Sequence, residues 1–302
     1  MPTDQNALAL RPHPPGPRSL RDLATRLRSG CGRLLRQYRF ACPPGHVTRG
    51  LRALGVCPGD TIMVQSAFSG FSYFKGSPID AIRSIVSAVQ PEGTVVMPAF
   101  PFDGTSFEYL ERHPTFDVKK SPARTGLLCE IFRRSFAPIR SLHPTHSVLA
   151  LGPRAKGIVG DHHRSRTPFD QHSPWHRLYE LNAWDVNVGL SLQRLAITHC
   201  HYFEERLESK LDLPLYWPEA FKAKVRDEHG GETSVQAYAH HPASRRARNY
   251  PRLSRRFLDA GALRHVRVGA IDIWAGRVRT LFEVVQDLVT KGIPAFHESA
   301  QT

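Results

Sequence analysis

Short apolar segments alternate with helix-start signals along most of this chain, and this alternation constrains the fold more than any other feature. Residues 61–65 form a short apolar strand candidate that follows a Pro-Gly turn. A helix is predicted over 77–89, because a serine can cap it, a proline suits its first turn and Asp80 complements the helix dipole. Residues 94–98 form a second buried strand candidate. Strands separated by helices predict a parallel sheet covered on both faces.

The same pattern continues beyond residue 98 and changes near residue 220. Residues 220–227 and 232–239 flank a His-Gly-Gly turn and predict a β-hairpin. The remaining predicted elements are strands at 147–151, 186–190 and 266–273, and helices at 125–135, 201–210 and 277–290. The sequence therefore predicts an α/β fold with a largely parallel central sheet, helices on both faces and a C-terminal region that contains the hairpin.

The positive charge of the chain is concentrated in two segments. The formal net charge is +14, from 41 basic and 27 acidic residues. Residues 1–50 carry nine arginines and two acidic residues, and residues 240–267 carry eight arginines and one acidic residue. The remaining residues are therefore electroneutral. Only Tyr250 and Phe257 are aromatic in the second segment, whereas a nucleic-acid-binding surface interleaves aromatic and basic side chains. We therefore expect no nucleic-acid partner.

The first 45 residues differ in composition from the rest. We predict a basic, Pro- and Arg-rich arm over 1–45 and one domain over 46–302. Residues 1–17 are rich in proline and predict disorder. Residues 19–39 carry leucines at helical spacing among arginines and predict a basic amphipathic helix. We expect this helix to pack on the body or on the second subunit of a homodimer; contact with an acidic surface or membrane is the alternative.

The cysteine and apolar content predicts a cytoplasmic protein that holds no metal ion. The five cysteines show no CxxC spacing, so neither a disulfide framework nor a cysteine zinc site is expected. No apolar run approaches the ~20 residues that cross a bilayer, and no secretory hydrophobic region is evident. Sixteen histidines invite a metal interpretation, but HExxH and the other standard zinc spacings are missing.

A polar loop after the first strand is the first of three segments suited to binding or catalysis. It covers residues 64–72 and is followed by Gly76 and Ser77 at a helix start. Loops at the carboxyl ends of strands bind ligands in α/β sheets, and a helix N-terminus favours phosphate. The alternative is an ordinary strand-to-helix connection.

The other two segments contain histidines. Residues 140–147 hold His143 and His146 around a Pro-Thr pair, and histidine transfers protons readily near neutral pH. His201 and Glu204 stand three residues apart, so they share one face of a predicted helix. A carboxylate there can accept the imidazole N–H, which leaves the other ring nitrogen free to take a proton. Structural histidines and a surface ion pair are the respective alternatives.

Taken in order, these segments resemble the aminoglycoside 3-N-acetyltransferase family, which differs in fold from the GNAT acetyltransferases. The resemblance covers roughly residues 48–292. The matching stretches are residues 51–60, 66–69, 91–98, 140–147, 173–174, 178–181 and the His-x-x-Glu at 201–204. The resemblance implies an acetyl-coenzyme A-dependent N-acetyltransferase that needs no metal and acts on a small-molecule amine, an activity associated with antibiotic resistance.

The resemblance also implies roles for individual residues. His201 would be the general base and Glu204 would orient it, with His146 in the same site as a second candidate for the base. The residues implied to hold the cofactor are Ser66, Phe68, Ser69, Gly76 and Ser77, and those expected near the acceptor are Asp103, His143 and Thr198. Thr198, or backbone N–H groups of the 66–69 loop, would stabilise the developing negative charge on the carbonyl oxygen.

The chain departs from the family pattern at three places. Gln65 stands where the loop usually begins with histidine, and the strand at 185–190 is more polar than usual. The arginines of 240–267 oppose a polycationic acceptor. The expected acceptor is an aminoglycoside, an amino sugar or a related natural product, and the arginines favour the less cationic of these. The alternatives are another acyl-coenzyme A or acceptor, and a coenzyme A-binding homologue without catalysis.

Overall fold

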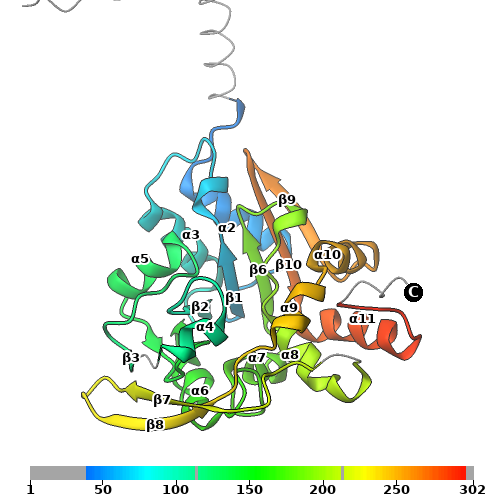
Figure 1. Ribbon diagram of the computed structural model, residues 1–302. Coiled ribbons are helices and arrows are strands. Elements are labelled where there is room, and N and C mark those ends of the chain that lie inside the picture. Colours follow the sequence, from blue (N-terminus) through cyan, green and yellow to red (C-terminus); the bar gives the residue numbers. More distant parts are fainter. Residues whose placement is uncertain (1–38, 113–114, 212–213, 297–302) are drawn as a thin grey trace, which may run out of the picture. The chain divides into compact units, whose positions relative to one another are not determined.

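The computed structural model describes residues 39–112, 115–211 and 214–296. The chain divides into two units, Met1–Ala41 and Cys42–Thr302, and the fold described below belongs to the second (Figure 1). Residues 1–38 of the predicted arm, with almost all of its helix at 19–39, lie outside the described residues, and the last two residues of the arm begin helix α2 (Pro44–Ala53). Each helix among the described residues is too short or too polar to span a bilayer.

A seven-stranded sheet with the order β4-β5-β2-β1-β6-β10-β9 forms the centre of the second unit. Its strands are β1 (Thr61–Ser66), β2 (Thr94–Pro98), β4 (Ile139–Arg140), β5 (Val148–Leu151), β6 (Trp184–Val188), β9 (Arg264–Val268) and β10 (Ile271–Arg277). The central strands β2, β1 and β6 are parallel, and only β5 and β10 run in the opposite direction to the other strands of this sheet. The predicted α/β class is therefore confirmed.

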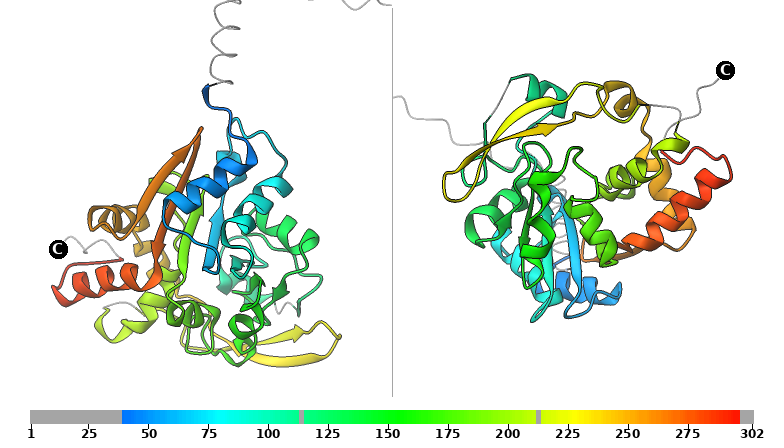
Figure 2. Two further views of the ribbon diagram at one scale, coloured as in Figure 1. Left: turned by 180° about the vertical axis from the view of Figure 1, so that it is seen from behind. Right: turned by 90° about the horizontal axis from the view of Figure 1, so that it is seen from below.

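Helices cover both faces of this sheet (Figures 1 and 2). One face carries α2 (Pro44–Ala53), α3 (Pro78–Val89) and α5 (Leu127–Ser135). The other carries α6 (Ala155–Val159), α7 (Pro174–Glu180), α8 (His199–Arg206), α10 (Tyr250–Asp259) and α11 (Val278–Thr290). Side chains alternate between the two faces along each strand. Ile62 and Val64 accordingly pack into the first core and Met63 into the second.

A three-stranded sheet with the order β3-β7-β8 lies at the lower edge of Figure 1. Its strands are β3 (Thr115–Asp117), β7 (Phe221–Arg226) and β8 (Glu232–Ala237). β7 and β8 form the predicted hairpin, and β3 pairs with β7 in parallel. The connections also contain α4 (Ser106–Glu111), α9 (Pro242–Ala247) and the 3-10 helices η1 (Phe68–Gly70), η2 (His162–Arg164), η3 (Leu192–Arg194) and η4 (Glu208–Lys210).

One predicted strand was wrong. The segment 266–273 is not a single strand, because it contains the turn between the antiparallel strands β9 and β10. Gly269 in this turn has a φ of 60°, a left-handed conformation that glycine adopts without steric cost. The apolar residues on both sides of the turn gave the segment the look of one continuous strand.

The loops that follow β1 and β6 meet through two glycines. A Cβ atom on Gly70 would lie 1.9 Å from the carbonyl oxygen of Gly189, which is far inside any real contact. Gly189 itself has a φ of 75°. Only residues without a side chain allow this approach, and it brings the carboxyl ends of the two parallel strands together.

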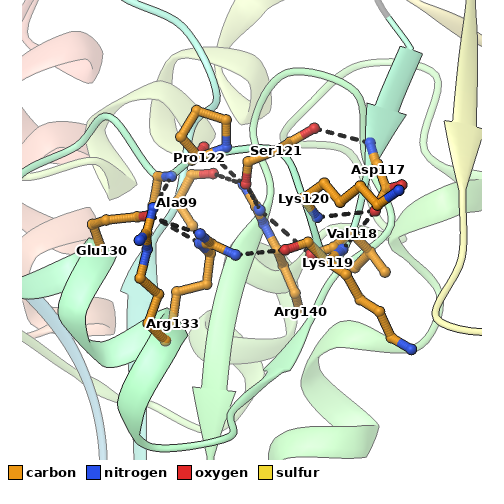
Figure 3. Close-up of polar contacts among 12 residues, drawn as sticks. Ala99, Asp117, Val118, Lys119, Lys120, Ser121, Pro122, Glu130, Arg133 and Arg140 are labelled. Carbon is orange, nitrogen blue, oxygen red and sulfur yellow. Dashed lines mark hydrogen bonds and ion pairs between the residues drawn. The ribbon is translucent and has the colours of Figure 1, made fainter.

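Arg140 fixes the far side of the same region (Figure 3). Its side chain is 7% exposed and lies 4.8 Å above the Phe116 ring. The guanidinium donates hydrogen bonds to the carbonyl oxygens of Ala99 (2.7 Å), Pro122 (3.3 Å) and Ser121. Burial lowers the pKa of Arg140 to about 10, so the group stays charged at neutral pH. One buried cation thus joins β4, the end of β2 and the loop after β3.

We predict that Arg140→Gln lowers the free energy of unfolding by roughly 3 kcal/mol, because the carbonyl groups of Ser121 and Pro122 lose the Arg140 donor and that of Ala99 keeps only the Ser147 hydroxyl. Urea denaturation of both proteins measures the change. Arg124→Gln is the matched control, since Arg124 forms an exposed ion pair with Asp103 and such pairs contribute little. Equal losses in the two variants would contradict a special role for Arg140.

Candidate active site

A cavity of about 620 Å³ opens where β1 and β2 end, and we call it the strand-end cavity. Its walls come from residues 64–69, from Met97, Pro98 and Phe100, from residues 125–127 and Cys129, and from Leu190, Ala196 and Thr198. Most of these side chains are apolar, and the hydroxyls of serines and threonines interrupt them. The cavity is therefore an apolar channel with a few hydrogen-bonding groups, as is usual for small-molecule sites.

Only some of the residues predicted to hold a cofactor line this cavity. Ser66, Phe68 and Ser69 line the strand-end cavity, whereas Gly76 and Ser77 do not. The Ser77 hydroxyl caps α3: it accepts from the backbone N–H of Asp80 (3.2 Å) and donates to the Asp80 carboxylate (2.7 Å). Gly76 lies where a Cβ would be 2.9 Å from the Phe74 ring. Both residues therefore have a local structural role at the start of α3.

A second cavity of about 350 Å³ adjoins the first, and Phe100 lines both. We call it the histidine cavity. Its lining residues are Phe100, Phe102, Gly104, Thr105, Ser106, His146, His201, His240, Pro242, Arg248 and Tyr250. The structure thus brings His146 and His201 to one wall, although 55 positions separate them in the sequence.

His201 lies in the first turns of α8, with 18% of its side chain exposed in the histidine cavity. Its Nδ1 is 3.2 Å from Oε2 of Glu204, which is 1% exposed, so the predicted pairing on one helix face is present. The Arg248 guanidinium donates two hydrogen bonds to the same carboxylate, from Nε to Oε1 (2.8 Å) and from Nη2 to Oε2 (2.7 Å). The Tyr250 hydroxyl lies beside the ring, 3.3 Å from Nε2.

The electrostatic surroundings keep this pair in the form that a general base requires. Burial, followed by the charge of Arg248, lowers the pKa of His201 below its ordinary value of 6.5. Burial raises the pKa of Glu204, but His201 and Arg248 outweigh it and leave the pKa lowered. Near neutral pH a neutral imidazole therefore donates its Nδ1–H to an ionised carboxylate, and Nε2 keeps a lone pair for a proton.

His146 and His143 are far more enclosed than His201. His146 packs against Phe100 with 4.5 Å between ring centroids, and its Nδ1 is 2.8 Å from the Thr145 hydroxyl. His143 stacks on His162 at 4.4 Å, and its Nδ1 accepts from the backbone N–H of His146 (3.1 Å). Burial lowers the pKa of both histidines, that of His143 to about 3. His146 reaches the cavity wall, while His143 supports it from behind.

Asp103 lies outside both cavities. It lines a separate hollow of about 320 Å³ together with Glu108 and Arg112. Its carboxylate accepts from Arg124 at 2.9 Å, and the pair is largely exposed. This hollow adjoins the histidine cavity, since Phe102 lines both.

A buried carboxylate lies behind the strand-end cavity, where the sequence showed only an unusually polar strand. Asp185 of β6 accepts from Nδ1 of His199 at 2.7 Å, and both side chains are buried. Asn187 also donates to Asp185 (3.2 Å) and accepts from the backbone N–H of Ala196 (2.9 Å). Burial raises the pKa of Asp185, and the hydrogen bond from His199 opposes the change. The polar residues of β6 therefore form one connected network.

Gln65 joins this network to Thr198. The neighbours assign its amide orientation: the nitrogen donates to Asp185 (3.1 Å), and the oxygen accepts from the Thr198 hydroxyl (2.8 Å). Nε1 of Trp175 donates to the same hydroxyl at 3.1 Å. The hydroxyl hydrogen of Thr198 is thus engaged with Gln65, so Thr198 offers the cavity a lone pair and not a donor. The use of Thr198 to stabilise an oxyanion stays a prediction.

Sequence reasoning missed Arg248, Tyr250 and His240 as residues of the site. It treated the arginines of 240–267 as a basic attachment, yet the Arg248 side chain is only 5% exposed and is paired. The sequence did contain one sign that this segment is folded: Asn-Tyr-Pro at 249–251 is typical of a capped helix start, and α10 begins there. Among the residues that the structure describes, no group of three or more His, Cys, Asp or Glu side chains could hold a metal ion.

Comparison with known proteins places the chain in a family. A family model described as aminoglycoside 3-N-acetyltransferase matches residues 63–290, which is most of the chain. The protein therefore belongs to the aminoglycoside 3-N-acetyltransferase family, as the sequence motifs predicted.

Curated relatives and solved structures agree with this assignment. Aminoglycoside N(3)-acetyltransferase VII of Streptomyces paromomycinus is 31% identical over 166 residues, 51% of this chain and 57% of its own length. The type IX enzyme of Micromonospora chalcea is 25% identical over 248 residues, 76% of this chain and 88% of its own. The alignment with the type VIII enzyme of Streptomyces fradiae covers 61% of that protein. The chain therefore spans less than two thirds of this relative and of the Streptomyces paromomycinus enzyme.

The fold itself has close counterparts. A crystal structure of the AAC(3)-IVa aminoglycoside acetyltransferase superimposes with a TM-score of 0.65 at 22% identity, covering 83% of this chain and 90% of that one. The AAC-IIIb structure, a binary complex with CoASH, gives 0.67 at 22% identity, covering 82% and 96%. At this identity the likeness establishes the shared architecture.

We predict that Glu204→Gln lowers the free energy of unfolding by about 3 kcal/mol, because the buried Arg248 guanidinium loses its carboxylate. Urea denaturation measures the loss. The double variant Glu204→Gln with Arg248→Met should recover at least half of it, since the unpaired buried charge is then gone. Purely additive losses in this double-mutant cycle would show that the two side chains are not coupled.

Proposed function

We propose that this protein transfers an acetyl group from acetyl-coenzyme A to an amine of an aminoglycoside, an amino sugar or a related acceptor, with His201 as general base. One observation carries the proposal: a neutral histidine paired with an ionised carboxylate lines a cavity that adjoins an apolar channel at the strand ends. Family membership supports the same reaction class. The acceptor would occupy the histidine cavity and the acyl donor the strand-end cavity.

The strand-end cavity suits an acyl thioester carrier of this kind. Its apolar walls fit a narrow chain, and Ser66, Ser69 and Thr125 provide polar contacts along it. Acetyl-coenzyme A, when bound, supplies an activated acetyl thioester. Cys129 also lines the cavity, but burial raises the pKa of its thiol to about 12 and its Sγ faces the Pro98 carbonyl at 2.9 Å. This cysteine therefore stays protonated and does not compete as a nucleophile.

His201 would hold the proton that the acceptor amine gives up as the new C–N bond forms. An ammonium has no lone pair for attack, so the amine must be deprotonated first, and Nε2 is the ring nitrogen available for that proton. Glu204 fixes the tautomer and stabilises the imidazolium, and Arg248 holds the carboxylate in place. Glu204 and Arg248 therefore act as positioning residues.

Backbone donors of the loop after β1 are our proposal for the oxyanion site. Thr198 is engaged with Gln65, and the Ala67 N–H is bonded to the Val188 carbonyl at 3.1 Å. Phe68 and Ser69 remain as candidates from the loop that lines the cavity. Rigid backbone groups need no reorganisation as charge develops on the carbonyl oxygen.

An acceptor screen tests the proposed reaction. Purified protein is incubated with acetyl-coenzyme A and a panel of aminoglycosides, amino sugars and simple amines, and free thiol release is recorded. Release that depends on an amine supports the proposal. Release only with another acyl-coenzyme A would favour the alternative donor, and coenzyme A binding by calorimetry without any release would indicate a non-catalytic homologue. A cytoplasmic location and a homodimer remain predictions from the sequence.

We predict that His201→Ala lowers kcat by roughly 10²- to 10⁴-fold, which is the usual contribution of a general base, while coenzyme A affinity changes little. His146→Ala is the matched comparison on the same cavity wall, and we expect a smaller loss from it. Stopped-flow thiol release and calorimetry give the two quantities. A fully active His201→Ala protein would transfer the role to His146.

We also predict that the acid limb of kcat has its midpoint below pH 6.5, because burial and the charge of Arg248 lower the pKa of His201. At lower pH the imidazole becomes protonated and the rate falls. Initial rates at saturating acceptor give the profile. A midpoint above pH 6.5 in the unaltered protein would contradict a His201 pKa that is lowered by burial and by Arg248.

A further inference from the structure

The Tyr250 hydroxyl lies beside the proposed base, on the wall of the histidine cavity. Its oxygen is 3.2 Å from Nδ1 and 3.3 Å from Nε2 of His201, so it faces the ring edge between the two nitrogens. The Nδ1–H is directed at Oε2 of Glu204, and the lone pair of Nε2 is therefore the acceptor that the ring offers to the hydroxyl. The hydroxyl thus lies next to the nitrogen that would take the proton of the attacking amine.

Two anchors fix the backbone on the N-terminal side of Tyr250. Arg248 is held by the buried carboxylate of Glu204. The side chain of Asn249 caps α10, where it accepts from a backbone N–H of the first turn at 3.1 Å. The backbone N–H of Asn249 donates to the Phe296 carbonyl at 2.8 Å. The Tyr250 hydroxyl therefore reaches the base from a segment whose position is fixed.

The Tyr250 hydroxyl is able both to donate and to accept a hydrogen bond near neutral pH. Burial raises the pKa of Tyr250 well above its ordinary value of 10, so the phenol keeps its proton. A protonated phenol does not act as a second base, but it has one O–H donor and lone pairs on its oxygen, and the hydrogen turns about the C–O bond. When the hydrogen turns away from His201, the oxygen presents a lone pair to an N–H group in the cavity.

A primary amine brings a second hydrogen to the reaction, which the base does not take. The neutral amine carries two N–H bonds and attacks the thioester carbonyl with its lone pair. As the C–N bond forms and the C–S bond breaks, one hydrogen passes as a proton to Nε2 of His201, and the imidazolium returns it to the leaving thiolate. The second hydrogen stays on the nitrogen of the amide product. A hydrogen-bond acceptor for this second hydrogen would fix the direction of the attacking lone pair.

We propose that Tyr250 is a second catalytic residue, whose hydroxyl oxygen accepts the N–H that the attacking amine keeps and so aims the amine at the thioester. The proposal rests on the amine acetylation proposed above and adds a residue to it. A nitrogen at a hydrogen-bond distance of about 2.9 Å from Nε2 of His201 can lie equally close to the Tyr250 oxygen, because the two atoms are 3.3 Å apart. The amine is then held at two points, from α8 and from α10.

Two tyrosine-to-phenylalanine variants separate this role from packing. Tyr250→Phe removes the hydroxyl and keeps the ring. Tyr216→Phe is the matched control, because the Tyr216 ring stacks on His240 of the same cavity at 5.3 Å, while its hydroxyl donates to Glu205 and not to the base. We expect kcat to fall about tenfold in Tyr250→Phe and less than about twofold in Tyr216→Phe. Equal losses would show that the cavity wall as a whole is responsible and would refute the proposal.

The number of hydrogens on the acceptor nitrogen gives the sharper measurement. The acceptors are 2-amino-2-deoxyglucose, an amino sugar, and 2-deoxystreptamine, a ring found in aminoglycosides, each compared with the derivative in which every amine carries one methyl group. A secondary amine gives its single hydrogen to His201 and has none left for Tyr250. Tyr250→Phe should therefore lower kcat about tenfold for the primary amines and less than about twofold for the methylated ones. A tenfold loss with both kinds of amine would contradict the proposed contact.

Calorimetry separates this proposal from the proposed reaction. The unaltered protein and Tyr250→Phe are saturated with coenzyme A and titrated with 2-amino-2-deoxyglucose or with glucose, which has a hydroxyl in place of the amine. Tyr250→Phe should weaken binding of the amino sugar about fivefold and that of glucose less than about twofold, because a charged N–H donor makes the stronger hydrogen bond. If no thiol is released but this difference is found, the proposed reaction fails while the contact with the amine holds. An equal effect on both sugars would overturn the proposal independently of turnover.

Discussion

The ion pair between Glu204 and Arg248 is the interaction on which the geometry of the histidine cavity and the proposed chemistry depend. It joins α8 to the segment before α10 across 44 positions of sequence, and both side chains are almost fully buried. A buried carboxylate without such a partner would take up a proton and lose its hold on the imidazole. With the partner present, Glu204 stays ionised and His201 stays neutral.

The fold places that pair beside the strand-end cavity through two independent constraints. The contact between Gly70 and Gly189 closes the loops after β1 and β6 on one side. On the other side, Arg140 draws the end of β2 and the loop after β3 toward β4. Phe100, which lines both cavities, follows directly after the Ala99 carbonyl that Arg140 binds. A change in the buried cation would therefore move the shared wall, even though Arg140 touches neither cavity.

Local periodicity was enough to predict the parts of the site that lie on one element. The three-residue spacing of His201 and Glu204 predicts their pairing in any helix, and the central strands are recognisable because each is a short apolar run. Arg248 could not be found in this way, since its partner is 44 positions away and the segment looked like exposed basic sequence. At Ser77 a helix start predicts free N–H groups that suit phosphate, and packing shows in addition a capping box that engages two backbone N–H groups. Sequence spacing predicts which side chains lie together on one helix or strand. Three-dimensional packing decides whether those side chains line a cavity.

The buried polar residues of β6 show how a departure from the family pattern can be compensated. Asp185 in an otherwise apolar sheet needs donors, and His199, Asn187 and Gln65 all supply them. Gln65 can serve here because an amide both donates and accepts. Its nitrogen satisfies the carboxylate, so its oxygen is left for Thr198. A histidine at that position in the neutral form would offer one donor and one acceptor on a rigid ring, and in the charged form no acceptor at all. The polar strand and the glutamine therefore belong together: Gln65 satisfies the Asp185 carboxylate with its nitrogen and the Thr198 hydroxyl with its oxygen.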